Sequence, residues 1–418
     1  MFRRYGTAPQ ILLIALSLVA DVRLVQASEP EALAISRNIQ QLHVPYGTIL
    51  DPVFASSDPG SSGFTEVVSY TRAGDSAIWT GHYLAAEAFR YQVTRSPEAL
   101  DNAWRALMGI RSLVDVTGTD VLARCLVPAA SPYAAGIQHE ESGHGIYYSS
   151  LGDQAYFWIG NTSRDQYSGV MFGLSVAYSL IDQPEVRDFI RRDVTRILND
   201  LLRHGWNVVM PDGSTSTTFL YRPEQQLSFL QIGRTVNPGR FGWMYALYRS
   251  VYAASLSVPI LFDNIDDHDH YFKFNLNYIN LYNLIRLEEA GSPFRGLYLN
   301  AYDTLRRRTE QHGNAHFNMV DRALKGDNGA RDIETIALLD QWLLRPRRDY
   351  WSDLRATYRA CGTNRACSPI PVNERMNTDF LWQRSPFQLS GGGSGTIETA
   401  AIDYILPYWM ARHYGLTQ

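Results

Sequence analysis

Two aspartates, Asp75 and Asp165, begin two segments of similar layout. After each aspartate come an alanine-rich amphipathic stretch, a short turn that ends in Pro-Glu, and a second amphipathic stretch. An aspartate in such a place can simply cap a helix, because carboxylates interact well with helix N-termini. Two aspartates that point from neighbouring helices into one cavity could also share acid–base chemistry. Hydrolysis of a glycosidic bond needs such a pair, since one group protonates the leaving oxygen while the other activates water or attacks the sugar.

Polar and aromatic residues accompany both aspartates in the sequence. We predict that they contact a substrate: Trp79 and His82 after Asp75, and Arg164, Gln166 and Tyr167 around Asp165. The charge of Arg164 would keep Asp165 ionised, which suits a base, whereas a proton donor needs a raised pKa. The sequence leaves open which of the two carboxylates takes which role.

A long insertion, residues 131–158, separates the two segments and contains His139-Glu-Glu-Ser-Gly-His144-Gly. Its histidines are five positions apart, and the two glycines disfavour a helix that presents both, so the pattern differs from the zinc-binding H-E-x-x-H. We expect a polar loop at the mouth of the cavity, with His144 in contact with the substrate; a solvated surface loop is the alternative. No Cys and His spacing resembles a zinc site, so no metal and no other cofactor is predicted.

A second loop with the composition of a binding site runs from Asp379 to Phe387 and is followed by Gly391-Gly-Gly-Ser-Gly395. Glycines allow the backbone to approach a ligand closely. Trp382 offers a stacking face and Arg384 offers polar contacts. We therefore predict that Trp382 and Arg384 bind the substrate.

These residues are positioned by helices that come in pairs. Amphipathic patterns predict helices over residues 78–93, 97–113, 170–180, 184–202, 278–289, 298–311, 332–344 and 398–414. One helical hairpin cannot bury its own apolar face, but hairpins repeated around a closed ring bury one another's. We predict an all-α fold, an (α/α) toroid, with loops at 51–63, 131–145 and 390–395 where Gly, Pro and Ser cluster. An open solenoid is the alternative, although repeats of about 34 or 40 residues are absent.

The runs GDSAIWTGHYLAAEAFRYQVT, residues 74–94, and RDQYSGVMFG, residues 164–173, resemble the six-hairpin glycosidase superfamily. Within it they look most like the unsaturated glucuronyl and rhamnogalacturonyl hydrolases. The resemblance covers residues 70–200 and implies an (α/α)6 barrel with aspartates at the starts of inner helices. Carried over by motif, Asp165 would be the general acid/base and Asp75 its companion. The insertion at residues 131–158 departs from the pattern of that family.

Composition narrows the class of protein. The net charge of −4 and the scattered Lys and Arg residues show no electrostatic footprint for nucleic acid. Aromatic residues reach 12%, which fits stacking platforms for sugars and fits equally well a large core. Cys361 and Cys367 are predicted to close a small disulfide ring in an oxidising compartment, and Cys125 is predicted to be a small buried residue.

The N-terminus predicts export. Arg3 and Arg4 precede the apolar run 11–20, and Val25-Gln-Ala27 has the form of a cleavage site. Residues 1–27 are therefore predicted to be a secretory signal peptide, with an uncleaved anchor as the alternative. Residues 28–418 would then form a single toroidal catalytic domain in the periplasm or outside the cell, without a membrane span.

The sequence thus predicts a glycoside hydrolase that acts on an oligosaccharide or polysaccharide, such as one that contains uronic acid. One alternative is a polysaccharide lyase of the same fold, in which Tyr167 or His144 removes a proton and Arg164 neutralises the substrate carboxylate. Another is a non-catalytic glycan-binding protein of the cell envelope. The oligomeric state is not predicted.

Overall fold

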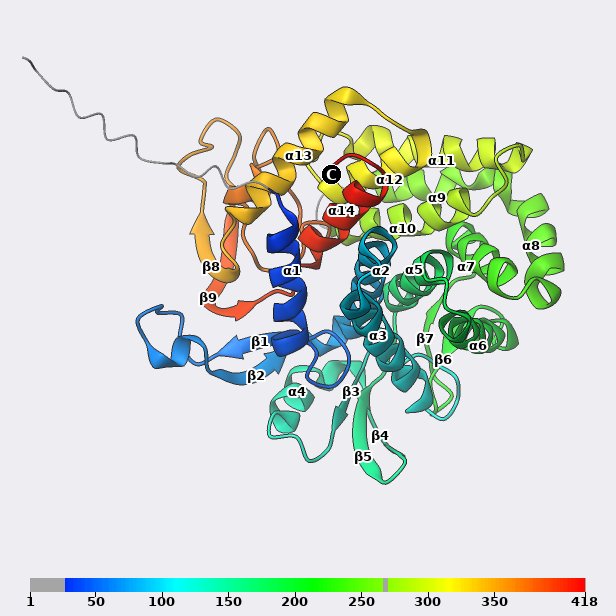
Figure 1. Cartoon of the computed structure of the whole chain (residues 1–418), viewed down its shortest axis with the longest axis horizontal. Coiled ribbons are helices and arrows are strands. Elements are labelled where there is room, and N and C mark those ends of the chain that lie inside the picture. Colours follow the sequence, from blue (N-terminus) through cyan, green and yellow to red (C-terminus); the bar gives the residue numbers. More distant parts are fainter. Residues whose placement is uncertain (1–26, 266–269, 418) are drawn as a thin grey trace, which may run out of the picture.

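The computed structural model describes residues 27–265 and 270–417, so the predicted signal peptide lies almost wholly outside the described residues. Most of the described chain is helical (Figure 1). Six helices are buried on nearly all sides: α2 (Ser76–Thr94), α5 (Arg164–Leu180), α7 (Pro223–Val236), α10 (Phe272–Arg286), α12 (Ala315–Lys325) and α14 (Ile402–His413). The prediction of a mostly α-helical protein is therefore confirmed.

The other helices cover these six. They are α1 (Glu29–Asn38), α3 (Pro97–Asp115), α4 (Ala134–Glu140), α6 (Pro184–Arg203), α8 (Pro238–Tyr252), α9 (Ser257–Ile265), α11 (Pro293–Thr309) and α13 (Gly329–Leu343). Among them, α3, α6, α8 and α11 each begin with a proline at the first helical turn. Proline is favoured there because the N–H that it lacks would have no partner within the helix. The predicted helix starts at Pro97 and Pro184 are confirmed.

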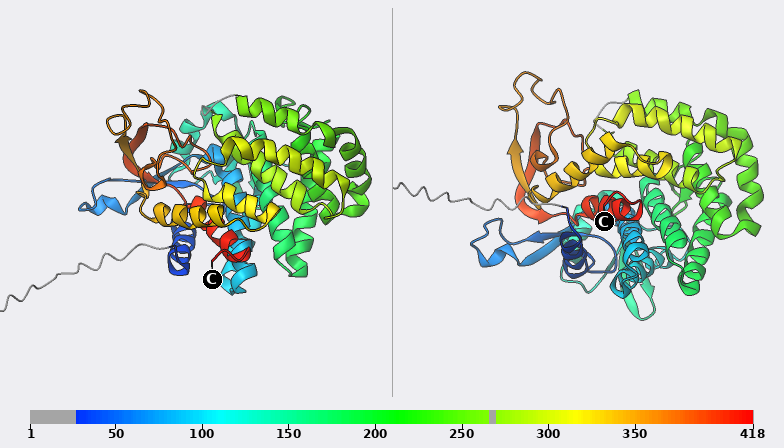
Figure 2. Two further views of the ribbon diagram at one scale, coloured as in Figure 1. Left: turned by 90° about the horizontal axis from the view of Figure 1, so that it is seen from above. Right: turned by 45° about the horizontal axis from the view of Figure 1, so that its top comes forward.

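The buried helices contact one another in succession. Helix α2 packs against α5, α5 against α7, α7 against α10, α10 against α12, α12 against α14, and α14 against α2. The views in Figures 1 and 2 show α14 and α2 side by side although they lie at opposite ends of the chain. The core consequently lies between helices that are distant in sequence.

The contact between α2 and α5 depends on glycines. A Cβ on Gly81 would lie 2.0 Å from the carbonyl oxygen of Gly169, and a Cβ on Gly173 would lie 2.2 Å from that of Gly81. Such distances are far below van der Waals contact, so neither position tolerates a side chain while the helices stay this close. This close approach brings the N-terminal ends of α2 and α5 together.

The prediction of an all-α chain is wrong in one respect, because the structure contains three small sheets. A four-stranded sheet has the order β2-β1-β9-β8, a three-stranded sheet the order β3-β5-β4, and a two-stranded sheet pairs β6 with β7. The strands are β1 (Asp51–Phe54), β2 (Val67–Thr71), β3 (Cys125–Pro128), β4 (Ile146–Leu151), β5 (Gln154–Ile159), β6 (Asn207–Val209), β7 (Thr215–Thr218), β8 (Arg348–Asp353) and β9 (Ser390–Glu398).

Two segments that were predicted to be loops contain strands. The first four residues of the predicted loop 51–63 form β1. Residues 390–395 belong to β9, which pairs with β8 and also with β1 from the N-terminal part of the chain. A Cβ on Gly392 would lie 2.4 Å from the carbonyl oxygen of Tyr350, so this glycine allows two backbones to pack tightly. Glycine in a strand often marks such a close approach. In the sequence, a glycine-rich strand of this kind looks the same as a glycine-rich loop.

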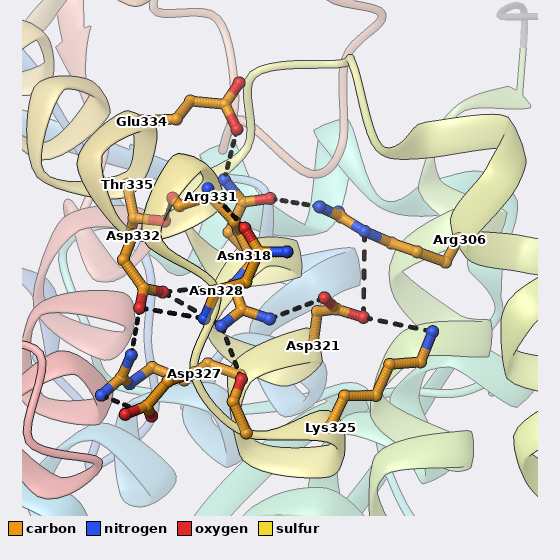
Figure 3. A network of polar contacts seen from close by, with 12 residues as sticks. Arg306, Asn318, Asp321, Lys325, Asp327, Asn328, Arg331, Asp332, Glu334 and Thr335 are labelled. Carbon is orange, nitrogen blue, oxygen red and sulfur yellow. Dashed lines mark hydrogen bonds and ion pairs between the residues drawn. The ribbon is translucent and has the colours of Figure 1, made fainter.

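A network of ion pairs and hydrogen bonds joins α11, α12 and α13 (Figure 3). Asp321 of α12 accepts a hydrogen bond from Arg331 of α13 at 2.7 Å and lies 3.9 Å from Nε of Arg306 on α11. Asn318 accepts from Arg306 and donates to Glu334. Since each carboxylate and guanidinium of this network has a partner on another helix, the network fixes how the three helices sit against one another.

None of the helices in the described part of the chain is both long and apolar enough to span a membrane.

Candidate active site

Asp75 and Asp165 lie close together at the N-terminal ends of α2 and α5, and Gln166 links them. The side-chain Nε2 of Gln166 donates a hydrogen bond of 3.0 Å to Oδ1 of Asp75, and its backbone N–H donates one of 3.0 Å to Oδ1 of Asp165. Its Oε1 accepts from the backbone N–H of Ile78. Gln166 is fully buried, so it positions the two carboxylates and is not itself available to a ligand.

Arg124, which precedes β3, ties the two aspartates together from the other side. Its Nη1 lies 3.9 Å from Oδ1 of Asp75 and donates to the carbonyl oxygen of Gly74 at 2.8 Å. Its Nη2 donates to the hydroxyl of Ser163, which in turn donates to Asp165. The guanidinium of Arg124 therefore contacts Asp75 directly and reaches Asp165 through the hydroxyl of Ser163, so it fixes the two carboxylates relative to each other.

The two carboxylates have different electrostatic surroundings. The pKa of Asp75 is raised to about 7, first by burial and then by the negative charges of Asp165 and Asp379, although Arg124 and Gln166 oppose the shift. Asp165 accepts hydrogen bonds from the hydroxyl of Ser163 and from the backbone N–H of Gln166. A third of the Asp75 side chain remains exposed, at 33%, so a ligand can reach it. Such a pair can combine a proton donor with a proton acceptor.

Glu141 and His144 from the insertion stand beside Asp75. Glu141, 4% exposed, accepts a hydrogen bond of 2.7 Å from the backbone N–H of Gly74, and its other oxygen lies 2.6 Å from Nδ1 of His144. The side chain of His144 is 43% exposed. The sequence predicts a loop for the insertion, but it folds as α4, a 3-10 turn and the β4–β5 hairpin. The folded insertion thus holds the exposed imidazole of His144 in a fixed orientation near Gly74. Contact of His144 with a substrate stays a prediction.

A second charged group adjoins Arg164. Burial, followed by the charge of Arg222, lowers the pKa of Arg164, and its Nη1 donates to the carbonyl oxygen of Thr218. Arg222, just before α7, is bound by Glu224 and Asp263 at 2.6 Å each. Tyr221, which precedes it, is 82% exposed. Arg222 therefore lies near Arg164, and Tyr221, its neighbour in the chain, presents an exposed aromatic ring.

Several predicted substrate contacts are buried instead. Trp79, His82, Tyr167 and Trp382 are each at most 4% exposed. The rings of His82 and Trp382 stack with centroids 5.3 Å apart, and burial lowers the pKa of His82 to about 4, so its imidazole stays neutral. The hydroxyl of Tyr167 accepts from the backbone N–H of Leu122. Trp79 and His82 pack against Trp382 and so hold α2 against the segment 379–382, whereas Tyr167 packs against Phe219.

Arg384 lies at the surface near Asp379, with its Nε 3.8 Å from Oδ2 of Asp379 and 57% of its side chain exposed. The pKa of Asp379 is raised by burial, while Arg72 and Arg384 act against that shift. A disulfide joins Cys361 to Cys367 in the irregular segment that leads to this region, and Cys125 is buried and free.

Sequence reasoning missed Asp379, Arg124 and Glu141 as site residues. Asp379 begins a segment whose composition predicts a binding loop, so a carboxylate there was a usable signal. Arg124 and Glu141 gave none, because only the tertiary structure brings Arg124 to Asp75 and brings Glu141 of the insertion to the adjoining Gly74. The described residues contain no group of three or more His, Cys, Asp or Glu side chains that could hold a metal ion.

Comparison of the chain with protein-family models, with curated proteins and with solved structures finds no match of any of the three kinds. A functional assignment for this chain therefore depends on the geometry of the site.

Proposed function

We propose that the chain folds as an (α/α)6 toroid with a single catalytic domain. The six buried helices, each contacting the next, support this, because the last of them, α14, packs against the first, α2. An open solenoid would leave its terminal repeats in contact with one neighbour only. The N-terminal ends of the inner helices α2 and α5 meet at Asp75 and Asp165, which is where the six-hairpin resemblance expects catalytic aspartates.

We infer that the protein is a glycoside hydrolase in which Asp75 is the general acid and Asp165 the general base. The observation that carries this is the contrast between the two carboxylates: burial and like charges raise the pKa of Asp75 to about 7, whereas hydrogen-bond donors surround Asp165. A carboxyl group that keeps its proton near neutral pH can serve as a general acid beside a second carboxylate that serves as the base. These roles are the reverse of those implied by the family resemblance.

In the proposed reaction the proton of Asp75 passes to the glycosidic oxygen as the bond between that oxygen and the anomeric carbon breaks. Asp165 accepts a proton from a water molecule whose oxygen attacks the anomeric carbon, so one water is consumed for each bond cleaved. Arg124 and Gln166 hold the two carboxyl groups for these transfers. Tyr221 and Arg384 are exposed, and we propose that they contact a sugar chain that contains uronic acid.

Export to the periplasm or beyond belongs to the same proposal. Cleavage of the predicted signal peptide after Ala27 would leave Ser28 as the first residue, just before α1 begins at Glu29. The disulfide between Cys361 and Cys367 supports an oxidising compartment. Mass spectrometry of the protein secreted by its host would test this, because an intact N-terminus would contradict it.

The decisive experiment is hydrolysis in oxygen-18 water. Purified mature protein and the variants Asp75→Asn, Asp165→Asn and Asp212→Asn would be incubated with a panel of bacterial and plant polysaccharides. We expect oxygen-18 in new reducing ends with the wild type and with the Asp212→Asn control, whose exposed carboxylate lies in the β6–β7 turn. Both active-site variants should lose on the order of a hundredfold or more in rate. Products that persist in Asp165→Asn would contradict the assignment.

A polysaccharide lyase is the second candidate, and the pairing of His144 with Glu141 is what favours it. The carboxylate of Glu141, 2.6 Å from Nδ1, fixes the orientation of the exposed imidazole, as a base that removes a proton requires. Tyr167 is unsuited to the role of base because it is buried. Unlabelled products with unsaturated ends, abolished in His144→Gln and retained in Asp165→Asn, would establish this chemistry. Binding of a glycan without any product would favour the third candidate, a glycan-binding protein.

A further inference from the structure

The outer face of α8 is apolar and open to solvent. Trp243, Leu247 and Val251 are spaced four residues apart, so they lie along one side of the helix, and they are 62%, 53% and 60% exposed. Gly239 and Gly242 also face open space, because a Cβ atom on either would have no other atom within 4 Å. Only Phe241 and Tyr245 of this helix are buried. Helix α8 therefore presents a stripe of apolar side chains to water.

Helix α9 continues this surface. Val258, Leu261, Phe262 and Ile265 are spaced three or four residues apart and are 51%, 51%, 69% and 76% exposed. Ile260 alone is buried, on the side of α9 that packs against α11. Only residues 253–256 separate α8 from α9 in the chain, and Figure 1 shows both helices on the right-hand side of the molecule. We call these seven side chains of the two helices the α8–α9 face.

An exposed apolar stripe is not a general property of the outer helices in this protein. The exposed positions of α6 include Glu185, Arg187, Asp188, Arg191 and Arg192, which are all charged. On α3, Met108 is the isolated exposed hydrophobic residue, at 44%. The α8–α9 face therefore differs from the outer sides of α3 and α6, and an amphipathic helix with its apolar side outward needs a covering partner.

The size of the face fits a protein interface. Seven side chains that are half to three-quarters exposed, two of them aromatic, offer on the order of 800 Å², since one aromatic side chain buries about 150–250 Å². The largest apolar patch on a typical monomer is about 300–600 Å². Each partner of a standard protein–protein interface buries about 800 Å².

Charge decides what kind of partner fits. Helices that bind a lipid surface carry Lys and Arg on their polar side, but α9 contains none, and its one charged residue is Asp263. The arginines of α8 are engaged, Arg249 with Glu288 and Arg240 with Asn199. A neutral apolar face without free charges is complementary to itself, and most soluble homo-oligomers are two-fold dimers that use the same patch on both subunits.

We propose that the protein is a symmetric homodimer whose subunits pack through the α8–α9 face. This inference is independent of the proposed catalytic chemistry.

Sedimentation velocity and light scattering on the mature chain over a range of micromolar concentrations test the proposal. Variants Leu247→Glu on α8 and Ile265→Glu on α9 would be compared with Met108→Glu, which puts the same charge on the isolated apolar residue of α3. We expect the wild type and Met108→Glu to sediment as dimers. Both variants of the face should raise the dissociation constant by on the order of a hundredfold or more, because each charge occurs twice in a symmetric interface.

Circular dichroism and thermal unfolding would show that the variants are folded. Because one variant lies on each helix, local unfolding of a single helix could not explain the loss of the dimer in both. A wild type that stays monomeric at all concentrations would overturn the proposal, as would a dimer that persists in both variants. A monomer that binds vesicles of neutral phosphatidylcholine through the same residues would identify the face as a lipid-binding surface instead.

Discussion

At the scale of single residues, the roles of Asp75 and Asp165 depend on their neighbours. Both aspartates begin a helix next to polar residues, so the local sequence makes them equivalent. The structure separates them, because Asp379 and Asp165 crowd Asp75 with negative charge while donors surround Asp165. The resulting assignment predicts how stability should depend on pH.

We expect Asp75→Asn to stabilise the folded protein at pH 8 but not at pH 4. The pKa of Asp75 is raised from 3.8 to about 7, so folding favours its protonated form. Its stabilising contribution is complete below about pH 4 and is lost as the pH rises through 7. Because an asparagine amide stays neutral, Asp75→Asn avoids this loss. The free energy of unfolding at pH 8 should therefore rise by about 1–2 kcal/mol, after allowance for solvent screening. Thermal unfolding from pH 4 to 8 would measure it.

Asp212→Asn is the matched control for that measurement. Hydrogen bonds from Ser214 lower the pKa of Asp212, so its removal should give no gain at pH 8. An equal gain for Asp75→Asn at both ends of the pH range would show that titration of this carboxyl is not the cause.

The Glu141–His144 pair should respond to a methyl group at Gly74. A Cβ there would lie 2.8 Å from Oε2 of Glu141 and 3.2 Å from Cε1 of His144. We expect Gly74→Ala to displace the pair and to lower turnover about tenfold or more, with a stability loss of about 1–3 kcal/mol from overpacking. Gly143→Ala, whose Cβ meets nothing within 4 Å, is the control. Full activity in Gly74→Ala would mean that turnover does not depend on the position of the Glu141–His144 pair.

At the scale of helices and strands, the sequence pattern predicted the helical pairs that bracket the site and missed the strands. The first two predicted pairs fall within α2, α3, α5 and α6, because proline starts and apolar spacing are local signals. Segments rich in Gly and Ser are predicted to be loops, yet residues 390–395 form part of β9. A strand is stabilised by partners that lie elsewhere in the chain, here Tyr350 of β8 and Val53 of β1.

The contact between α2 and α5 should fail if Gly81 gains a side chain. Its Cβ would lie 2.0 Å from the backbone of Gly169, so Gly81→Ala must push the helices apart and should cost about 3 kcal/mol or more. Gly296→Ala on α11 has no atom within 4 Å and should stabilise the helix by about 0.5–1 kcal/mol. Urea unfolding of both variants would measure the difference. Equal stabilities would rule out the close approach of α2 and α5.

At the scale of the whole molecule, elements from the N-terminal and C-terminal parts of the described chain pack together. Helix α14 packs against α2 and α1, and strand β9 pairs with β1. Arg348 of β8 strengthens this junction, because its guanidinium lies 4.0 Å from the ring centroid of Phe54 and 3.7 Å from that of Phe64. The N-terminal and C-terminal parts of the chain therefore depend on each other for burial.

A chain truncated before Ile402 should fail to fold. Residues 402–411 are all buried between other inner helices, so their loss would expose the core on both α2 and α12. An open solenoid would tolerate loss of its last helix far better, because each repeat contacts only its neighbours. Circular dichroism and proteolysis of the truncated protein, with removal of only the last two residues as the control, would decide between them. Cooperative unfolding of the truncated chain would contradict a closed ring.

The sequence by itself determined the features that depend on short stretches of chain. These are the helical pairs with their proline starts, the two aspartates that begin α2 and α5, and the two cysteines that form a small disulfide ring. Propensity, capping and spacing over a few residues suffice for such features. A mostly helical fold could be predicted for the same reason.

Only the tertiary structure decided which side chains face the site. Trp79, His82, Tyr167 and Trp382 have the composition of a sugar site, but packing buries them. Arg124 and Asp379 come from separate segments to lie near Asp75, and Glu141 binds the backbone of the adjoining Gly74. The roles that we propose for the two aspartates follow from this arrangement, because burial and neighbouring charges set the pKa of Asp75. Periodicity within a helix shows that a face is apolar, but whether the core or another subunit covers it depends on where the rest of the chain lies, as the exposed stripes of α8 and α9 show.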